Sequence, residues 1–303
     1  MNVKLQKSNF RYRKLKISDY KEFKQLFYSC FKKKISFDFF RWRYFSNKLS
    51  FCYGIFESSK LIANVGMVSI QLNNKINEKI YSRHSSMVLK KYRGRGFFSD
   101  LLKNLKKKIS NKISLIIMWP NKKNFSNFNI KKKQIIEKKY YLYKTYSKNG
   151  TSNKTKNYPI SELIKFKNLI KSNDNLFLKN FSYFKKRYCS YNDHEYFINE
   201  YKFNKSESFF ILKRNINKSG LDYVVLDHFG SKKISSKHLE YLIEDQNKLI
   251  FLSKKKIFKS NHELINSINL KIDFLKKINI KEKNNFLVNK EIFLGDTDIF
   301  ITI

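Results

Sequence analysis

Several residue types that often mark a function are scarce in this sequence. Its 303 residues include 8 glycines, 2 prolines and 3 cysteines. Cys30, Cys52 and Cys189 are odd in number and far apart, which excludes a disulfide framework and a zinc-binding spacing. We expect three reduced thiols, as in cytoplasmic proteins, and no metal.

Long hydrophobic runs are also missing. The longest clear one, LIIMW at 115–119, has the length of a buried strand and is far shorter than a membrane-spanning helix. The first ten residues, MNVKLQKSNF, lack the apolar stretch of a signal peptide. The sequence therefore predicts a cytoplasmic protein with no transmembrane segment.

Acidic residues are few, because 24 Asp and Glu stand against 64 Lys and Arg and leave a formal charge of +40. Such a charge is typical of nucleic-acid-binding proteins. Most of these basic residues are lysines, however, and they accompany abundant Asn, Ile, Phe and Tyr, which are residue types of AT-rich genomes. We expect no dedicated nucleic-acid partner, although the charge should favour anionic ligands.

The first half of the chain has the pattern of a mixed α/β domain, which we place at residues 1–147. Strand-like and helix-like stretches alternate there, and Ser18 is the predicted N-cap of the first helix. The expected strands lie at 9–17, 51–56, 61–72, 80–89 and 113–119, and the expected helices at 18–31, 37–45 and 97–109.

A polar stretch at 148–160, which contains Gly150 and Pro159, is the best candidate for a linker. Beyond it, a second domain is expected at 161–303. A short echo connects the halves, because FFRWRYFS at 39–46 resembles YFKKRYCS at 183–190. The echo suggests two copies of one fold in tandem, of which the second has no glycine-rich loop.

The stretch KKYRGRGFFSD at 90–100 concentrates Arg93, Gly94, Arg95 and Gly96 between a predicted strand and a predicted helix. Glycines let backbone N–H groups converge on one point, and a helix N-terminus adds partial positive charge. This combination predicts an anion site that suits a pyrophosphate. The full dinucleotide-binding fingerprint and the P-loop are both absent.

The segment MVLKKYRGRGFFSDLLKNL resembles motif A of the GCN5-related N-acetyltransferases (GNAT family), whose signature is Gln/Arg-x-x-Gly-x-Gly/Ala. Arg93 and Gly96 match the first two signature positions, whereas Phe98 replaces the final Gly or Ala. The resemblance covers roughly residues 9–146. It implies the GNAT-like acyl-CoA N-acyltransferase fold, an α/β (α+β) fold with a mixed sheet, and a degenerate second copy in tandem.

The resemblance implies that acetyl-CoA is the acyl donor and that its pyrophosphate lies against the loop. Backbone groups of Met87 and Val88 would pair with the pantetheine arm, and one amide there would polarise the thioester oxygen. Asn121, or alternatively Asn124, would contact pantetheine after the fifth strand. The backbone amides of Arg95, Gly96, Phe97, Phe98 and Ser99 would hold the pyrophosphate, with Gly94 in the same loop. The side chains of Arg93 and Arg95 would reach either the phosphates or solvent.

Direct acyl transfer needs a base for the amine and an acid for the leaving thiolate. His84 is the leading candidate for the base, because its ordinary pKa lies near neutrality; packing in the core is the alternative. Ser85, Ser86 and Tyr81 are weaker candidates. The tyrosine that serves as the acid in the family is missing, so solvent, Tyr140 or Tyr141 would supply that proton.

Two further segments are candidates for contact with the acceptor. Trp42, Arg43 and Tyr44 lie on the helix that overhangs the acceptor cleft in this fold, and core packing is the alternative for Trp42 and Tyr44. Asp296 and Asp298 either form a tight turn or face the acceptor.

These observations predict an N-acetyltransferase that moves an acetyl or short acyl group from acetyl-CoA to a small-molecule amine. An amino sugar of a cell-envelope polysaccharide is one candidate acceptor, suggested by the resemblance alone. A non-catalytic CoA-binding or scaffold module is an alternative. An aminoacyl-tRNA-dependent transferase on the same tandem fold is another, which the Arg-Gly loop disfavours. The sequence does not indicate an oligomeric state.

Overall fold

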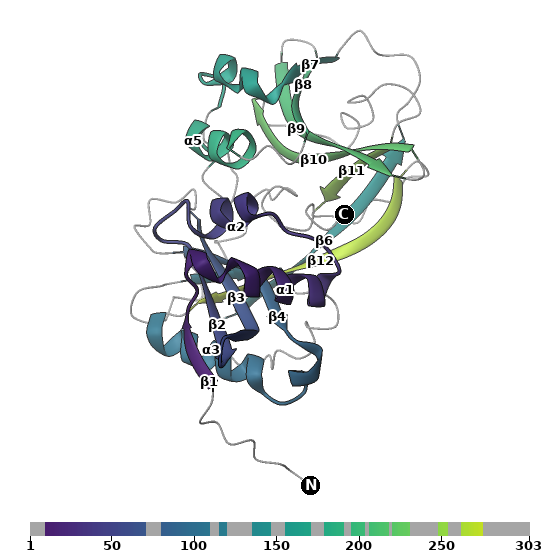
Figure 1. The fold of residues 1–303 in the computed structure, drawn as a ribbon. Helices are drawn as coiled ribbons and strands as arrows, with labels where there is room; N and C mark the ends of the chain where they lie inside the picture. The colour runs from purple at the N-terminus through teal and green to yellow at the C-terminus, as the bar shows by residue number, and fades with distance from the viewer. Residues whose placement is uncertain are drawn as a thin grey trace.

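The computed structural model describes eleven segments of the chain, which together carry both halves of the fold (Figure 1). Within these segments, no helix is both long enough and apolar enough to cross a bilayer. The described segments are residues 10–70, 80–109, 115–119, 135–146, 155–170, 179–190, 195–203, 206–217, 220–230, 248–253 and 262–274.

The described residues of the first half form six strands, three α-helices and two short 3₁₀ turns. In chain order these are β1 (Phe10–Lys14), η2 (Ile17–Asp19), α1 (Tyr20–Phe31), α2 (Phe37–Tyr44), β2 (Phe51–Glu57), β3 (Lys60–Ile70), β4 (Ile80–Val88), η3 (Lys90–Tyr92), α3 (Phe97–Ile109), β5 (Leu115–Met118) and β6 (Ile135–Tyr146).

The described part of the second half also contains six strands, but only one short α-helix. In chain order its elements are β7 (Thr155–Pro159), η5 (Ile160–Phe166), α5 (Phe181–Phe184), the π-helical turn η6 (Lys185–Cys189), β8 (Tyr196–Phe203), β9 (Ser206–Asn217), β10 (Gly220–Gly230), β11 (Lys248–Ser253) and β12 (His262–Phe274).

Local sequence determines where the first two helices begin. The Oγ of Ser36 accepts a hydrogen bond from the N–H of Phe39 and caps α2, as expected for serine before a helix. The prediction that Ser18 caps α1 is wrong, because Ser18 lies inside η2. Asp19 stabilises that turn instead, by accepting hydrogen bonds from the N–H of Lys16 and from the guanidinium of Arg13.

The described strands form one sheet, in the order β1-β2-β3-β4-β5-β12-β6-β11-β10-β9-β8-β7. Strands β2, β3 and β4 form an antiparallel meander, and β5 then pairs with β4 in parallel. Strands β8, β9 and β10 form a second antiparallel meander, and β11 pairs with β10 in parallel. The mixed α/β sheet expected from the sequence is therefore confirmed, and the two halves share one order of pairing.

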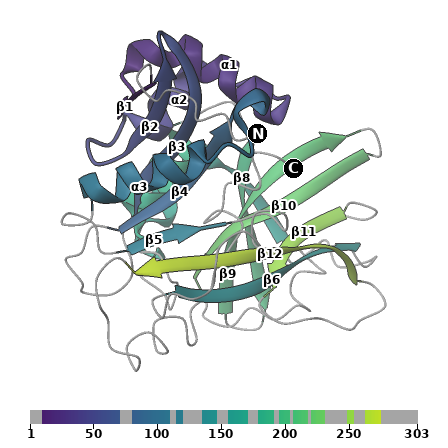
Figure 2. The ribbon, with the colours of Figure 1, turned by 90° about the horizontal axis from the view of Figure 1, so that it is seen from below.

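The two halves exchange strands at the centre of the sheet. Strand β12, from the C-terminal part of the chain, lies between β5 and β6, and β6 pairs on its other side with β11 (Figure 2). Residues 155–159, expected within the linker, form β7 and pair with β8. The boundary expected at 148–160 thus does not separate two sheets, and the division into domains at 1–147 and 161–303 stays a prediction.

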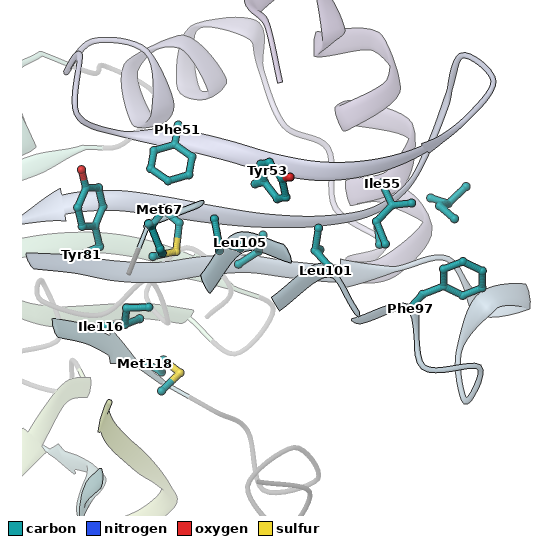
Figure 3. Close-up of a cluster of buried hydrophobic side chains, with 14 of the residues drawn as sticks. Phe51, Tyr53, Ile55, Met67, Tyr81, Phe97, Leu101, Leu105, Ile116 and Met118 are labelled. Carbon is teal, nitrogen blue, oxygen red and sulfur yellow. The ribbon is translucent and has the colours of Figure 1, made fainter. Parts of the chain in front are cut away.

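Helices cover both faces of the sheet in the first half. On one face α3 packs on β2, β3 and β4 through Phe97, Leu101, Leu105 and Ile109 (Figure 3). On the other face α1 and α2 bury Phe23, Leu26, Phe27, Phe39, Phe40 and Tyr44. The alternating side chains of β4 therefore point into two different environments.

Candidate active site

The loop between β4 and α3 has the backbone conformation that its two glycines allow. Gly94 and Gly96 have φ angles of +76° and +80°, values that residues with a side chain rarely adopt. A Cβ built at either glycine would meet no atom within 4 Å. Space beside the backbone and two left-handed residues are what close approach of a phosphate requires.

The N-terminus of α3 faces the same loop. The N–H of Asp100 donates to the carbonyl of Gly96 at 3.0 Å, which is the first helical hydrogen bond of α3. The backbone amides of Phe97, Phe98 and Ser99 precede that bond and have no acceptor one turn earlier within the helix. They lie at the positive end of the helix dipole, so this place favours an anion.

Two contacts hold the loop against the sheet. The hydroxyl of Tyr92 donates to the carboxylate of Glu57 on β2, and the ring of Tyr92 meets that of Phe97 edge-on at 5.4 Å. Burial and the hydrogen bond to Glu57 raise the pKa of Tyr92, so this hydroxyl stays protonated. The sequence analysis missed this anchor, because a lone Glu in a strand gives no local signal of its partner.

The side chain of Arg93 does not extend toward the glycines. Its Nε donates to the carbonyl of Val88 at 2.9 Å, and its guanidinium also contacts the Sγ of Cys30 on α1 at 3.7 Å. Arg93 therefore connects the loop, the end of β4 and α1. The carbonyl of Val88 is occupied by this bond, so pairing of pantetheine with the backbone stays a prediction for Met87 and for the amide of Val88.

Strands β4 and β5 pair only over part of their length. Their parallel register runs from Ile80 opposite Leu115 to Arg83 opposite Met118, whereas β4 continues to Val88. The pairing of β4 with β3 is also irregular between the Met87 and His84 positions. At this place a ligand in an extended conformation could form hydrogen bonds with the backbone of β4.

Ser85 lies at the irregularity of β4 and has a φ angle of +43°. Its Oγ is 2.6 Å from the hydroxyl of Tyr44, and its carbonyl accepts a hydrogen bond from the amide of Asn64. Gly66 makes this arrangement possible, because a Cβ there would lie 2.6 Å from the ring of Tyr44. Tyr44 is thus packed in the core, which was the alternative to contact with the acceptor, and its hydroxyl is directed at β4.

The candidate catalytic residues on β4 other than Ser85 lie in three different environments. His84 is opposite Gly66 and shares the face of Tyr44; it is 7% exposed. Tyr81 is on the other face, in the apolar cluster beneath α3, where burial raises the pKa of its hydroxyl (Figure 3). Ser86 is exposed. The structure therefore brings His84 close to Tyr44 and Ser85 and separates it from Tyr81.

Trp42, one of the predicted acceptor-contacting residues of α2, lies against the second half of the molecule. The indole Nε1 of Trp42 donates to the carbonyl of Lys186 on η6 at 3.0 Å. Arg43 is 6% exposed, and its guanidinium carbon lies 5.7 Å from the centre of the Trp42 ring. Helix α2 therefore forms part of the junction between the halves.

Some predicted positions cannot be placed. Asn121, Asn124, Asp296 and Asp298 lie outside the described residues. In the described part of the chain, no group of three His, Cys, Asp or Glu side chains is arranged to hold a metal ion.

Of the two tyrosines considered as the acid, Tyr140 is buried on β6. Its ring meets that of Trp119, directly after β5, edge-on at 6.5 Å. Trp119 packs against the same apolar cluster as Leu142, which shares a face of β6 with Tyr140. Tyr140 therefore lies near the end of β5, where β4 and β5 have stopped pairing.

Similarity to known proteins agrees with this geometry. Residues 11–128 match the family model of the acetyltransferase (GNAT) domain. Among curated proteins, no sequence matches this chain.

Solved structures share the fold at low sequence identity. A GCN5-related N-acetyltransferase from Anabaena variabilis has a TM-score of 0.63 at 10% identity, over 88% of this chain and 73% of its own. A probable N-acyltransferase of unknown function from Enterococcus faecalis has a TM-score of 0.62 at 12% identity, with the same coverages. A putative acetyltransferase from Pyrococcus horikoshii has a TM-score of 0.52 at 11% identity, over 97% of this chain and 96% of its own.

The matched residues run from α1 through the glycine loop to β5, and they do not include β6, which carries Tyr140. The match also agrees with the motif that Arg93 and Gly96 carry. Residues 11–128 of this chain are therefore similar to the acetyltransferase domain of the GNAT family, and the described residues have the fold of solved GCN5-related N-acetyltransferases.

Proposed function

We propose that this protein transfers an acetyl or short acyl group from acyl-CoA to the amine of a small molecule. The observation that carries the proposal is the open cradle formed by Gly94 and Gly96 at the N-terminus of α3, beside the end of β4. A pyrophosphate fits that cradle, because left-handed glycines and the first helix amides direct several N–H groups at one point.

The end of β4 has the features needed to hold an extended pantetheine arm. Among the described residues, pairing of β4 with β5 stops at Arg83, and a ligand could form backbone hydrogen bonds with the part of β4 beyond it. Arg93 and Cys30 fix the carbonyl of Val88, which holds the strand end in place relative to the loop. When bound, acyl-CoA supplies the thioester whose acyl group is transferred.

We assign His84 as the group that takes the proton from the acceptor amine. It lies one residue before Ser85, on the face of β4 that carries Tyr44, and a histidine can exchange protons near neutral pH. Tyr81 is a poor alternative, because it points into the apolar cluster on the other face. Tyr140, near the end of β5, is our candidate for returning a proton to the thiolate.

The test is the affinity for acetyl-CoA, measured by calorimetry. Gly96→Glu puts a carboxylate into the cradle and strains the backbone, so we expect affinity to fall by about a hundredfold or more. Arg93→Ala should cost about tenfold, since this arginine acts through the Val88 carbonyl. Lys21→Gln, at an exposed position of α1, changes the charge by the same single unit as Gly96→Glu and should bind normally.

If acetyl-CoA does not bind the wild-type protein, or if Gly96→Glu and Arg93→Ala bind like wild type, the proposal is wrong. Release of free thiol with a panel of amines, including amino sugars, then separates an enzyme from a CoA-binding module without activity. Binding of CoA with no thiol release from any amine would favour the module.

A further inference from the structure

Helix α1 and the start of α2 carry large aromatic side chains that the fold does not bury. Tyr28 is 52% exposed, Phe31 is 39% exposed and Phe37 is 41% exposed. Tyr28 and Phe31 are one turn apart on α1 and share a face of the helix. Tyr20 lies on that face too, and its ring meets that of Phe37 at 5.2 Å. Exposed apolar side chains that gather in this way mark an interaction surface, and we call Tyr28, Phe31 and Phe37 the α1 ridge.

Positive charge surrounds the α1 ridge. The Nζ of Lys32 lies 5.8 Å from the centre of the Tyr28 ring, and the Nζ of Lys24 lies 5.9 Å from that of Tyr20. A lysine rests its methylene stem on an apolar ring and keeps its ammonium in water, where the charge is accessible to an anion. The exposed lysines of α1 and of the segment that follows it include Lys21, Lys24, Lys32 and Lys34.

The α1 ridge lies beside the candidate active site. The Sγ of Cys30, between Tyr28 and Phe31 in the sequence, donates to the carbonyl of Val88 at 3.5 Å. Figure 1 shows α1 in front of β3 and β4. A surface that binds the ridge would therefore lie close to the end of β4, where we place the pantetheine arm.

The chemistry of the α1 ridge distinguishes between classes of partner. A second copy of this chain would carry the same formal charge of +40 and would be repelled. Lysine is depleted at interfaces between proteins, where arginine is preferred. At an anionic bilayer, by contrast, aromatic side chains enter the boundary between headgroups and acyl chains, and lysines are attracted to the anionic lipids. Asp38, the acidic residue beside Phe37, is paired with Arg41 and so does not oppose that attraction.

We propose that the α1 ridge binds the surface of an anionic lipid bilayer, with its three rings among the headgroups and the surrounding lysines on the lipid phosphates. The end of β4 then lies close to the bilayer, and amines at the membrane surface are within reach of the candidate site. This inference goes beyond the proposed acyl transfer, and the binding itself does not depend on it.

Sedimentation of the full chain with lipid vesicles tests the proposal. One set of vesicles contains phosphatidylcholine alone, and the other contains phosphatidylcholine and phosphatidylglycerol in equal parts. We expect binding to the anionic vesicles only. Tyr28→Ser combined with Phe31→Ser leaves the net charge unchanged and should weaken that binding by about tenfold or more, because two rings are lost from the interface.

A matched control removes exposed apolar side chains elsewhere. Ile164 and Leu169, in the second half, are 60% and 42% exposed. Ile164→Ser combined with Leu169→Ser should bind the anionic vesicles like wild type. Far-UV circular dichroism checks that each variant is folded before its binding is compared.

The lysines are tested in a second pair of variants, which leave the rings in place. Lys24→Gln combined with Lys32→Gln should weaken binding to the anionic vesicles by about tenfold. Lys60→Gln combined with Lys167→Gln removes the same charge at two exposed positions away from the ridge and should have little effect.

The proposal is overturned if the anionic vesicles bind no protein, or if the variant of Tyr28 and Phe31 binds them like wild type. Equal weakening by the two lysine pairs would also contradict it, because general attraction of a highly basic chain would then explain the binding. Binding to polyglutamate that requires Tyr28 and Phe31, without binding to vesicles, would overturn it in favour of an acidic protein partner. Absence of acetyl-CoA binding would refute the proposed function alone, whatever the vesicle results.

Discussion

Each half of the molecule has a tyrosine at the equivalent position, but the two tyrosine hydroxyls bond to different groups. Tyr44 follows the first aromatic pair of the echoed segment and bonds to Ser85, at the irregularity of β4. Tyr188 occupies the matching position 144 residues later and bonds to Asp227, at the register shift of β10. The helix caps match as well, since Ser36 caps the helix that ends at Tyr44, and Asn180 caps the short helix before the turn that contains Tyr188.

The difference lies in what surrounds each bond. In the second half, Asp227 is 0% exposed and also bonds to the ammonium of Lys179 and the hydroxyl of Tyr183. In the first half, Ser86 is exposed beside Ser85, and the open glycine loop follows the strand. The position of this tyrosine thus lies beside exposed residues and the glycine loop in the first half. In the second half the equivalent position is filled by a buried ion pair.

The largest expected effect concerns folding, because we expect that the first half does not fold without the second. A polypeptide that ends at residue 147 would lack β12 and β11, the two strands that flank β6, and β5 would lose its neighbour β12. Unpaired edges and lost burial should leave this fragment without a cooperative transition. Urea unfolding followed by circular dichroism checks this, with the full chain as reference. A cooperative fragment with the midpoint of the full chain would show that the exchanged strands are dispensable.

Removing the buried carboxylate is the next largest change. Asp227→Ala removes the carboxylate that forms an ion pair with Lys179, which is 2% exposed, and should cost about 3–5 kcal/mol of the free energy of unfolding. Denaturant unfolding measures the loss. Asp38→Ala, which removes an exposed ion pair with Arg41, is the matched control and should change little. Equal effects of the two variants would argue against a closed second half.

Local features of the fold were predictable from sequence. The helix expected at 97–109 is α3, and the two clustered glycines that precede it have positive φ angles. These signals depend on residues within one or two turns of each other. Ser18 failed as a cap because Asp19 bonds to Arg13 on the preceding strand, a contact that spacing alone does not reveal.

The exchange of strands was beyond sequence reasoning. β12 pairs with β5, which is more than 140 residues earlier in the chain. The hydrophobic pattern of a strand indicates which face is buried, but it does not indicate which strand lies beside it. Residues 155–159 were similarly misread, because a polar edge strand with Pro159 has the composition of a linker. The orientation of Arg93 toward Val88 is a third case, since its motif position suggested the phosphates.

Two glycines offer a sharper comparison of the halves. Gly230 has a φ angle of +99°, and a Cβ there would lie 2.8 Å from the carbonyl oxygen of Glu207. Gly230→Ala should therefore cost about 2–3 kcal/mol of stability and leave acetyl-CoA affinity unchanged in the folded protein. Gly96→Ala, in open space, should cost about 1–2 kcal/mol and also weaken acetyl-CoA binding by about tenfold.

Thermal unfolding and calorimetry on the same two samples separate these effects. Weakened acetyl-CoA binding in folded Gly230→Ala would place ligand contacts in the second half. Normal binding by Gly96→Ala would argue against the cradle.

The smallest expected effects come from the two tyrosine hydroxyls themselves. Tyr188→Phe removes a hydrogen bond to a buried carboxylate and should cost about 1.5–3 kcal/mol, because bonds to charged groups are the stronger ones. Tyr44→Phe removes a bond between two neutral hydroxyls and should cost about 0.5–1.5 kcal/mol. Since Ser85 adjoins the proposed base, Tyr44→Phe should also lower kcat, whereas Tyr188→Phe should not. A loss of kcat in Tyr188→Phe alone would mean that the closed half, and not the open one, positions the reacting groups.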